Sequence, residues 1–350
     1  MTSHPDPSRP ITILGDGQMG LVCAGVLANH PERPKVTLWG HESKPVLALA
    51  QTRVSPRLPQ ARLHDSVRVT PDDAAALRDT GLVVCAVPTQ FIRPVLERLA
   101  RNVPRGVPVV SVSKGIENGT LLRPTQVILD VLDGSPAPIA GSSARSTGVL
   151  SGPTIAPELG RCLPATMVAA SDDAALARRV QTLFTTSWLR IYTSTDPIGV
   201  EVAGATKNVI ALAAGIIDGL QAGYNAKSAL LARGLAEIAR LGAALGARPE
   251  TFFGIAGVGD LATTCFSPEG RNRSCGEALG KGEKLDSYLE RTKFVVEGVA
   301  TTLAVMELSR TLRVEMPITA AVHAVLYEGL DPIDAISRLM SREPKAERVG

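Results

Sequence analysis

The sequence contains few cysteines and few aromatic residues. Its five cysteines are scattered, without a C-x-x-C pair or a matching pair of histidines, so we expect neither a disulfide framework nor a zinc site. The sequence therefore predicts no metal site. Aromatic residues make up only 3% of the chain, and no run of basic residues is interleaved with them, as a surface that binds nucleic acid would require.

Excess charge and long apolar runs are scarce too. The formal net charge of +3 over 350 residues is too small to attract nucleic acid or a membrane surface. The longest uncharged apolar run, Val209–Ile217, is too short to cross a bilayer, and Met1–Pro10 lacks the apolar core of a secretion signal. The length and a hydrophobic content of 45% predict a compact cytoplasmic protein with two domains and a small-molecule ligand.

What the chain does contain is a glycine-rich turn near its start. Gly15, Gly17 and Gly20 form a G-x-G-x-x-G pattern that follows the apolar strand Ile11–Leu14 and runs into the helix-like stretch Leu21–Ala28. In this order the glycines permit a tight turn, a close approach of backbone to phosphate and close packing of helix on strand. The positive end of the helix then faces the anion, so the pattern predicts a bound dinucleotide.

The next strand leaves the choice between NAD and NADP open. This strand, Lys35–Trp39, arrives where the second strand of a βαβ unit is expected, and it carries no carboxylate at its tip to bind the ribose 2′-hydroxyl. His41 is compatible with a 2′-phosphate and equally with an exposed loop. Glu42, one position later, is within reach of a hydroxyl.

Strands and helices alternate up to about residue 195. Residues 1–195 are therefore predicted to form an α/β, Rossmann-like dinucleotide-binding domain with a mostly parallel sheet and helices on both faces. Residues 196–350 lack strand signals and are predicted to form an all-helical substrate and catalytic domain. The further strands expected are Leu82–Val87, Val107–Ser113, Val149–Ser151, Ala165–Ala170 and Leu189–Tyr192, and the strongest helices are Phe91–Ala100, Ala174–Phe184, Gly199–Gly219, Lys227–Leu245, Val299–Leu312 and Ile318–Glu328.

Two lysines are candidates for chemistry. Lys207 interrupts a helix of small and apolar residues, and burial there would lower its pKa toward neutrality, as a general acid or base requires. The alternative is a lysine that extends to solvent from a structural helix. Lys114 follows the predicted strand Val107–Ser113, where ligands of this architecture bind, and suits an anionic or carbonyl substrate. A lysine in a surface turn is the alternative.

Other polar groups stand beside glycines. Asp260 and Thr264 are one helical turn apart and share a face, although Asp260 as a plain helix cap is an alternative. Arg271–Arg273 is a dense group of donors suited to phosphate, and exposed, ion-paired arginines are the alternative. Gly152 and Thr154 join a strand end to a helix start, where a capped turn explains them equally well.

These motifs together resemble the NAD(P)-dependent sn-glycerol-3-phosphate dehydrogenases over nearly the full length of the chain. Each motif appears in the order that the family has. The matching segments are Gly15–Gly20, Val87–Phe91, Ser113–Glu117, Ser151–Ala156, Val200–Glu201 through Lys207–Asn208, Gly257–Leu261, Arg271–Arg273 and Val295–Gly298.

The resemblance implies roles for individual residues. Lys207 would exchange a proton with the substrate C2 oxygen, Lys114 would contact both substrate and cofactor, and Asp260 and Thr264 would complete the catalytic site. Arg271 and Asn272 would hold the substrate phosphate, with Gly152 and Thr154 at further substrate positions. Cofactor positions would be Gly15, Gly17, Gln18, Met19, Gly20, His41, Phe91, Lys114, Ala156, Arg271, Val295 and Glu297.

The implied reaction interconverts dihydroxyacetone phosphate and sn-glycerol 3-phosphate by hydride transfer with NAD(P)(H), in a homodimer that supplies phospholipid synthesis. Two positions depart from the family. Met19 stands where an aromatic residue is usual, which would alter the packing or affinity of the cofactor, and Gly270 replaces a serine. Neither change removes a group on which proton or hydride transfer depends.

Two other functions are compatible with this organisation. A ketopantoate or hydroxyacid reductase also pairs a dinucleotide domain with helices and a lysine, but Arg271–Arg273 favours a phosphorylated substrate. A non-catalytic NAD(P) sensor would be expected to have lost the active-site groups, and Lys114, Lys207, Asp260 and Arg271 are all present.

Overall fold

The computed structural model describes residues 9–137, 145–292, 294–343 and 346, so most of the N-terminal segment Met1–Pro10 lies outside the described residues. Their contacts form two compact units. The first comprises the chain up to Ser113 together with Pro124–Pro197. The second comprises Lys114–Arg123, called the strap below, and the chain from Ile198 onward.

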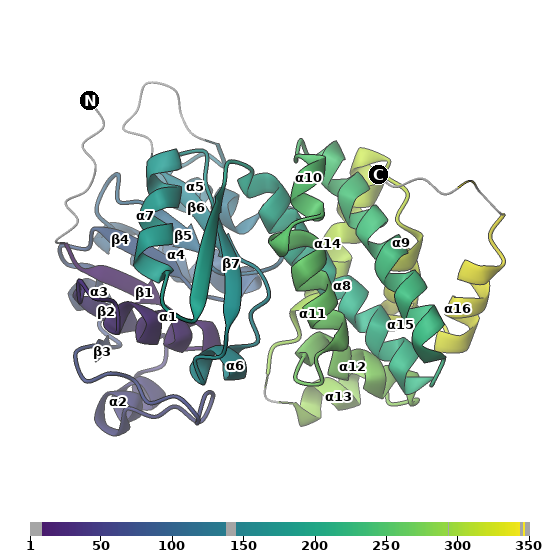
Figure 1. Cartoon of the computed structure of the whole chain (residues 1–350), viewed down its shortest axis with the longest axis horizontal. Helices are drawn as coiled ribbons and strands as arrows, with labels where there is room; N and C mark the ends of the chain where they lie inside the picture. The colour runs from purple at the N-terminus through teal and green to yellow at the C-terminus, as the bar shows by residue number, and fades with distance from the viewer. Residues whose placement is uncertain (1–8, 138–144, 293, 344–345, 347–350) are drawn as a thin grey trace. The chain divides into compact units, whose positions relative to one another are not determined.

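The described part of the first unit contains one eight-stranded sheet (Figure 1). Its strand order is β3-β2-β1-β4-β5-β6-β7-β8, and every neighbouring pair is parallel except β6 and β7. The predicted mostly parallel sheet is therefore confirmed. The strands are β1 Ile11–Leu14, β2 Val36–Trp39, β3 Arg68–Thr70, β4 Leu82–Cys85, β5 Val109–Ser111, β6 Thr147–Ser151, β7 Ala165–Ala170 and β8 Leu189–Ser194.

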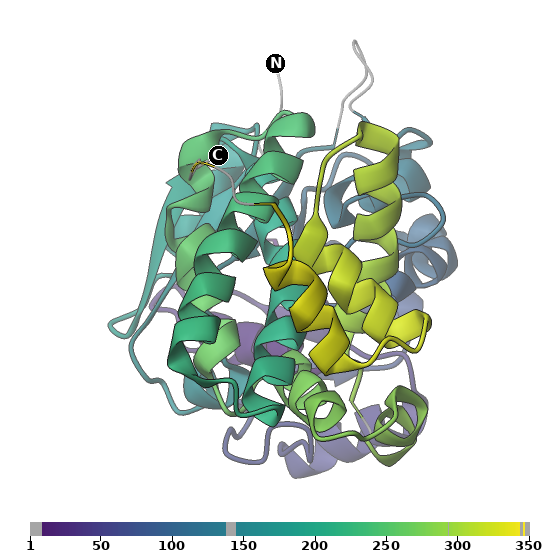
Figure 2. The same ribbon diagram turned by 90° about the vertical axis from the view of Figure 1, so that its right-hand side faces the viewer.

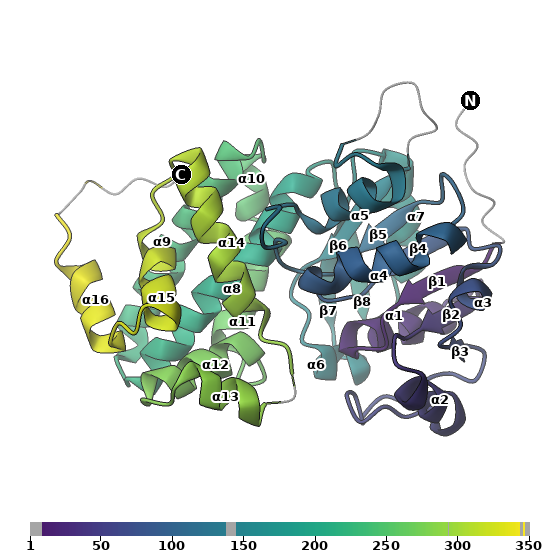
Figure 3. The same ribbon diagram turned by 180° about the vertical axis from the view of Figure 1, so that it is seen from behind.

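Helices cover both faces of this sheet. α1 (Gln18–Ala28) packs against α6 (Ala156–Gly160) and α7 (Ala174–Phe184), whereas α4 (Ile92–Leu99) packs against α5 (Pro124–Asp133) on the opposite face (Figures 1 and 3). α4 buries one apolar stripe, as an amphipathic pattern dictates, whereas most residues of α1 are buried. On α4 the buried residues are Ile92, Val95, Leu96 and Leu99. The short helices α2 (Ser43–Thr52) and α3 (Asp73–Leu77) follow β2 and β3.

The described part of the second unit contains helices and no strand, as predicted (Figure 2, green to yellow). Four of its helices match the predicted ones to within about four residues at each end. The helices are α8 Pro197–Gly219, α9 Gly223–Ala244, α10 Pro249–Phe252, α11 Asp260–Phe266, α12 Arg271–Gly280, α13 Leu285–Arg291, α14 Glu297–Leu312, α15 Pro317–Tyr327 and α16 Pro332–Met340, with a widened π-type turn over Ile255–Gly259.

α8 is the core helix of the second unit. It is apolar around most of its circumference, which is typical of a helix enclosed by protein. Of the described helices, it alone has the length and composition to cross a membrane, and 94% of its apolar window is buried inside the structure. Glycines bring α12 against it: a Cβ on Gly215 would lie 1.9 Å from the Arg273 carbonyl oxygen, and one on Gly276 would lie 2.0 Å from that of Leu212. The two helices therefore touch through their backbones.

Candidate active site

The amino group of Lys207 lies buried in the second unit between an acid and a hydroxyl. Lys207 is 6% exposed, and its Nζ donates to Asp260 Oδ1 and to Thr264 Oγ1, each at 2.5 Å. The alternative of a lysine that extends to solvent is therefore wrong. A buried ammonium requires such partners, because it has lost its hydration.

Asp260 binds two ammonium groups at once. It is fully buried at the start of α11, directly after the π-type turn, and its Oδ2 accepts a hydrogen bond of 2.6 Å from Lys114 Nζ. The helix is preceded by Gly259 at its N-cap, so Asp260 is not the plain helix cap that we considered as an alternative. Thr264, one turn later, donates to the Asp260 backbone oxygen at 2.8 Å and faces the same way, as the spacing predicted.

Lys114 reaches this acid because the strap leaves the sheet. The side chain of Lys114 is 13% exposed, which rules out the surface turn. Ile116 is fully buried in the core of the second unit, and Arg123, at the other end of the strap, forms an ion pair with the buried carboxylate of Glu201 on α8. The strap is thus tied to the second unit at both ends.

The environment tunes the acidity of Lys207. Burial lowers its pKa from 10.5 to about 8, the negative charge of Asp260 opposes this change, and the positive charge of Lys114 adds to it. A lysine with a pKa near 8 is mostly protonated at neutral pH, yet it can release and regain its proton during turnover. The predicted lowering of the pKa by burial is therefore present in the structure.

The start of α12 gathers a second group of predicted residues. Arg271 is exposed, and its Nη1 donates to the Val295 carbonyl oxygen at 3.3 Å. Asn272 is buried, and its Oδ1 accepts from the Gly298 backbone N–H at 2.9 Å. The amide of Asn272 is therefore fixed in orientation, with its carbonyl toward α14. Gly270 is the N-cap residue of α12, where a serine would supply a hydroxyl.

Glu297 links the two groups electrostatically. It is half-buried at the start of α14, where desolvation raises its pKa, and the charges of Arg271, Lys114 and Lys207 act in the opposite direction. Three cations therefore face two carboxylates, those of Asp260 and Glu297. The remaining positive charge suits an anionic substrate.

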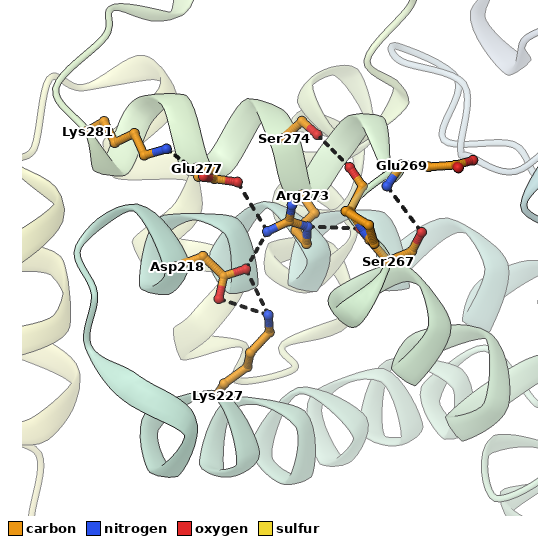
Figure 4. A network of polar contacts seen from close by, with 9 residues as sticks. Asp218, Lys227, Ser267, Glu269, Arg273, Ser274, Glu277 and Lys281 are labelled. Carbon is orange, nitrogen blue, oxygen red and sulfur yellow. Dashed lines mark hydrogen bonds and ion pairs between the residues drawn. The ribbon is translucent and has the colours of Figure 1, made fainter.

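Arg273, the last residue of the predicted donor group, is held by carboxylates of the second unit. Its Nη1 lies 2.6 Å from Asp218 Oδ2 and 3.2 Å from Glu277 Oε2, and its Nε donates to the Ser267 carbonyl oxygen (Figure 4). Lys227 binds both carboxylate oxygens of Asp218 at 2.8 Å. Arg273 therefore secures α12 to α8, and its two neighbours Arg271 and Asn272 remain as the candidates for the phosphate.

The glycine turn of the first unit fits a dinucleotide pyrophosphate. Gly15 has φ +111°, which favours glycine, and a Cβ on Gly20 would lie 1.9 Å from the Gly15 carbonyl oxygen. Gly17 is the N-cap residue of α1, and the space where its Cβ would point is open within 4 Å. The Asp16 carboxylate, which would repel phosphate, forms an ion pair with Arg57 at 2.9 Å. These observations match a backbone cradle for an anion.

The remaining predicted residues also belong to the first unit. Gln18 donates to the Arg57 carbonyl oxygen at 2.9 Å, and Met19, in the first turn of α1, is partly buried against the core. His41 and Phe91 are exposed after β2 and β4. Gly152, with φ +144°, Thr154 and the buried Ala156 follow β6 at the start of α6.

Three groups near the catalytic cluster were not predicted. The Arg123–Glu201 ion pair is one, although an isolated acid on an apolar helix was a usable signal. The Gly298 backbone N–H is another, and no side-chain pattern reports it. The third is Asn208, next to Lys207: its Nδ2 is buried and has no hydrogen-bond partner among the described residues.

A dinucleotide-type sheet in one unit and a buried lysine–aspartate cluster in the other define an NAD(P)-dependent oxidoreductase. The sequence model described as NAD-dependent glycerol-3-phosphate dehydrogenase N-terminus matches residues 10–177, and that of the C-terminus matches residues 196–337. The chain belongs to this family. The family, fold class, enzyme class and NAD(P) cofactor predicted from the sequence are confirmed, and the predicted reaction follows from membership.

Individual relatives agree with this assignment over nearly the whole chain. The chain is 45% identical over 338 residues to glycerol-3-phosphate dehydrogenase [NAD(P)+] of Prosthecochloris aestuarii, with 96% of this chain and 99% of that protein covered. It is 45% identical over 339 residues to the protein of the same name from Geobacillus kaustophilus, with 96% of each covered. The crystal structure of glycerol-3-phosphate dehydrogenase from Coxiella burnetii superimposes with a TM-score of 0.89 at 33% identity, covering 96% of this chain and 100% of that one.

Proposed function

We propose that the chain interconverts dihydroxyacetone phosphate and sn-glycerol 3-phosphate with Lys207 as the group that exchanges a proton with the substrate C2 oxygen. The observation that carries this assignment is the buried Lys207 ammonium between Asp260 and Thr264, with a pKa lowered to about 8. When bound, the nicotinamide ring donates a hydride to C2 or accepts one from it. In the reducing direction Lys207 polarises the C2 oxygen and then transfers a proton from Nζ to it.

Lys114 and Asp260 would support that proton transfer. Asp260 holds the two ammonium groups on its two oxygens, so it fixes their positions, and its charge opposes the lowering of the Lys207 pKa. Lys114 would bind the substrate as a second cation and keep the pKa of Lys207 low. Thr264 limits the rotation of the Lys207 ammonium by accepting one of its hydrogens.

Arg271 and Asn272 would bind the phosphate at the far end of the substrate. A guanidinium offers paired donors for phosphate oxygens, and the Asn272 amide carbonyl already accepts from Gly298, which directs its NH2 group elsewhere. Binding energy from this remote end would align C2 with Lys207. Gly152 and Thr154 would contribute further substrate contacts.

Residues 1–195 would act as the dinucleotide-binding domain and residues 196–350 as the substrate domain. Gly15, Gly17, Gln18, Met19 and Gly20 would surround the pyrophosphate at the N-terminus of α1. Along the rest of the cofactor we assign His41, Phe91, Lys114, Ala156, Arg271, Val295 and Glu297.

In the cell, the enzyme would work in the cytoplasm as a homodimer and supply glycerol 3-phosphate for phospholipid synthesis. These assignments rest on the family to which the chain belongs. Light scattering of the purified protein tests the dimer. Rescue of a bacterium that requires added glycerol or glycerol 3-phosphate tests the supply role.

The central test is Lys207→Ala. The variant should lose nearly all turnover with dihydroxyacetone phosphate while it still binds NADH and NADPH, because Lys207 belongs to the second unit and the glycine turn to the first. Normal turnover in this variant would refute the assignment. Oxidation of NADH and NADPH is followed separately with dihydroxyacetone phosphate and with ketopantoate, and turnover with ketopantoate alone would show the wrong substrate class.

A further inference from the structure

An arginine that no sequence motif indicated lies at the tip of β2, where a Rossmann-like unit contacts the adenosine ribose. Arg98, from the last turn of α4, donates through Nε and Nη2 to the two carboxylate oxygens of Asp73, both at 2.8 Å. Its Nη1 donates to His41 Nδ1 at 3.1 Å. The tip of β2 therefore carries a guanidinium beside the histidine predicted to contact the cofactor.

The guanidinium is held on a rigid support. Its Cζ lies 5.4 Å from the centre of the Trp39 ring, and Trp39 is 1% exposed at the end of β2. The Trp39 Nε1–H also donates to Asp73 Oδ1 at 3.0 Å. Asp73 is thus bound by both Trp39 and Arg98, which orients the Arg98 guanidinium.

This arrangement leaves donors for a ligand. An arginine side chain has five N–H donors, and Asp73 and His41 use three of those on Arg98, so one remains on each terminal nitrogen. Because arginine only donates, His41 Nδ1 accepts and its proton lies on Nε2, which becomes a further donor. Residues 41–45 are all exposed, so the tip of β2 is open to solvent in the first unit.

Donors of this kind select a phosphate over a hydroxyl. The ribose of NADPH carries a 2′-phosphate where NADH carries a hydroxyl, and an arginine near the second strand is one known way to accommodate that phosphate. NADH selection commonly uses a carboxylate at the tip of β2, where this chain has Trp39, Gly40 and His41 instead. Asp73 offsets part of the charge of Arg98, so the preference should be moderate. Glu42 at the N-cap of α2 opposes it further.

We propose that Arg98, oriented by Asp73 and Trp39 and acting together with His41, binds the 2′-phosphate of NADPH and gives this enzyme a preference for NADPH over NADH. The proposal concerns the choice of cofactor within the NAD(P)-dependent activity. It does not depend on which residues of the second unit perform the catalysis.

The test measures binding without turnover. Dissociation constants of NADPH, NADH, 2′,5′-ADP and 5′-ADP are measured by calorimetry for the wild type and for Arg98→Met. The wild type should bind NADPH and 2′,5′-ADP more tightly than their counterparts. Arg98→Met should weaken both by about 10- to 100-fold, the value of a charge-assisted hydrogen bond, and change NADH binding by less than about twofold.

Three further variants separate the phosphate contact from general effects. Arg93→Met removes another ion-paired arginine of α4, whose partner is Asp130 at 2.7 Å, and should leave the NADPH-to-NADH ratio unchanged. Arg98→Met combined with Asp73→Asn removes the charge pair as a whole and should still abolish the preference. Glu42→Gln should strengthen it.

Two results would overturn the proposal. One is a wild type that binds 2′,5′-ADP no more tightly than 5′-ADP. The other is a ratio of NADPH to NADH affinity that survives both Arg98 variants. Neither result would count against the proposed reaction, because that reaction is tested separately, by the reduction of dihydroxyacetone phosphate with NADH in the wild type. Retained NADH binding shows that a variant is folded.

Discussion

Replacing Asp260 by asparagine should shift the pH dependence of the reaction to lower pH. The carboxylate lies 2.5 Å from the Lys207 ammonium, and it opposes the burial that lowers the pKa of Lys207 to about 8. At about 3 Å between charge centres and an effective dielectric constant of about 20, the attraction amounts to roughly 5 kcal/mol, an upper limit of about 4 pKa units. Asparagine keeps an acceptor oxygen, so we expect about half of this shift, to a pKa of about 6.

The size of the resulting defect depends on pH. Reduction requires protonated Lys207, and at pH 7.5 a fall of the pKa from about 8 to about 6 reduces the protonated fraction roughly 25-fold. At about pH 5.5 the same change is nearly without effect, because both forms of the enzyme are then mostly protonated. The assay is kcat/KM for dihydroxyacetone phosphate between about pH 5.5 and 8.5, expressed as the ratio of wild type to Asp260→Asn. Ionisation of the substrate phosphate cancels in this ratio.

The opposite direction provides an internal control. Oxidation of sn-glycerol 3-phosphate requires neutral Lys207, so its pH profile should shift by the same amount and in the same direction. The exposed acid Asp286 on α13 gives a matched variant, Asp286→Asn, whose profile should equal that of the wild type. A ratio that stays constant with pH would mean that Asp260 only aligns groups, and the electrostatic reasoning would be refuted.

Three other changes should have measurable effects. Burial raises the pKa of Glu237 from 4.5 to about 7, so its protonation stabilises the folded state fully below about pH 4.5, and this contribution, about 3 kcal/mol, is lost as the pH rises through 7. Urea unfolding at pH 5 and pH 8 measures how much the free energy of unfolding falls between these pH values, and Glu237→Gln should reduce that fall. An equal fall in the wild type and the variant would contradict the prediction. Gly215→Ala should lower the stability measured by thermal unfolding and raise KM for the substrate, because its Cβ would clash with the backbone of α12. Gly25→Ala is the matched control: its Cβ would point into open space, so it should be neutral or stabilising in the same assay. Arg123→Met combined with Glu201→Leu should release the strap without leaving a lone buried charge. As Lys114 moves away from Lys207, the pKa of Lys207 should increase, and the alkaline limb of the reduction profile should move to higher pH. An unchanged limb with an unchanged KM would show that the ion pair has no positioning role.

The bounds of a helix or strand could be predicted from the sequence where the segment's own apolar pattern matches the burial of its side chains. β1, β7 and α7 begin and end at the predicted residues, because each strand is a short, mostly apolar run and the buried side chains of α7 recur at helical spacing. β3 was not predicted, since it has three residues and only Thr70 is buried. Its place at the sheet edge comes from parallel pairing with β2, which no pattern within the segment encodes.

Candidate site residues could be found from the sequence, but their partners could not. Lys207 stood out as a lone cation in an apolar helix, and its burial follows from that setting. Asp260 is 53 positions away, and only folding brings the two together. The same limit applies to Arg273, whose ion-pair partner Asp218 is 55 positions earlier on α8. A cation near a phosphate-binding motif and a cation held by a distant acid look alike in sequence.

The contact between α8 and α12 connects Lys207, the proposed proton-transferring group, to the proposed phosphate-binding residues. Lys207 lies eight residues before Gly215, about 12 Å along α8, and Arg271 lies five residues before Gly276, about 7 Å along α12. Because the glycines put backbone against backbone, the separation of these groups is set by two rigid helices and not by adaptable side chains. Gly298 adds a third constraint, since its N–H holds Asn272 and a Cβ there would lie 2.7 Å from the Asn208 carbonyl oxygen. A substrate with a longer carbon chain between its carbonyl and its phosphate would therefore meet a fixed span, and discrimination by length follows from helix packing.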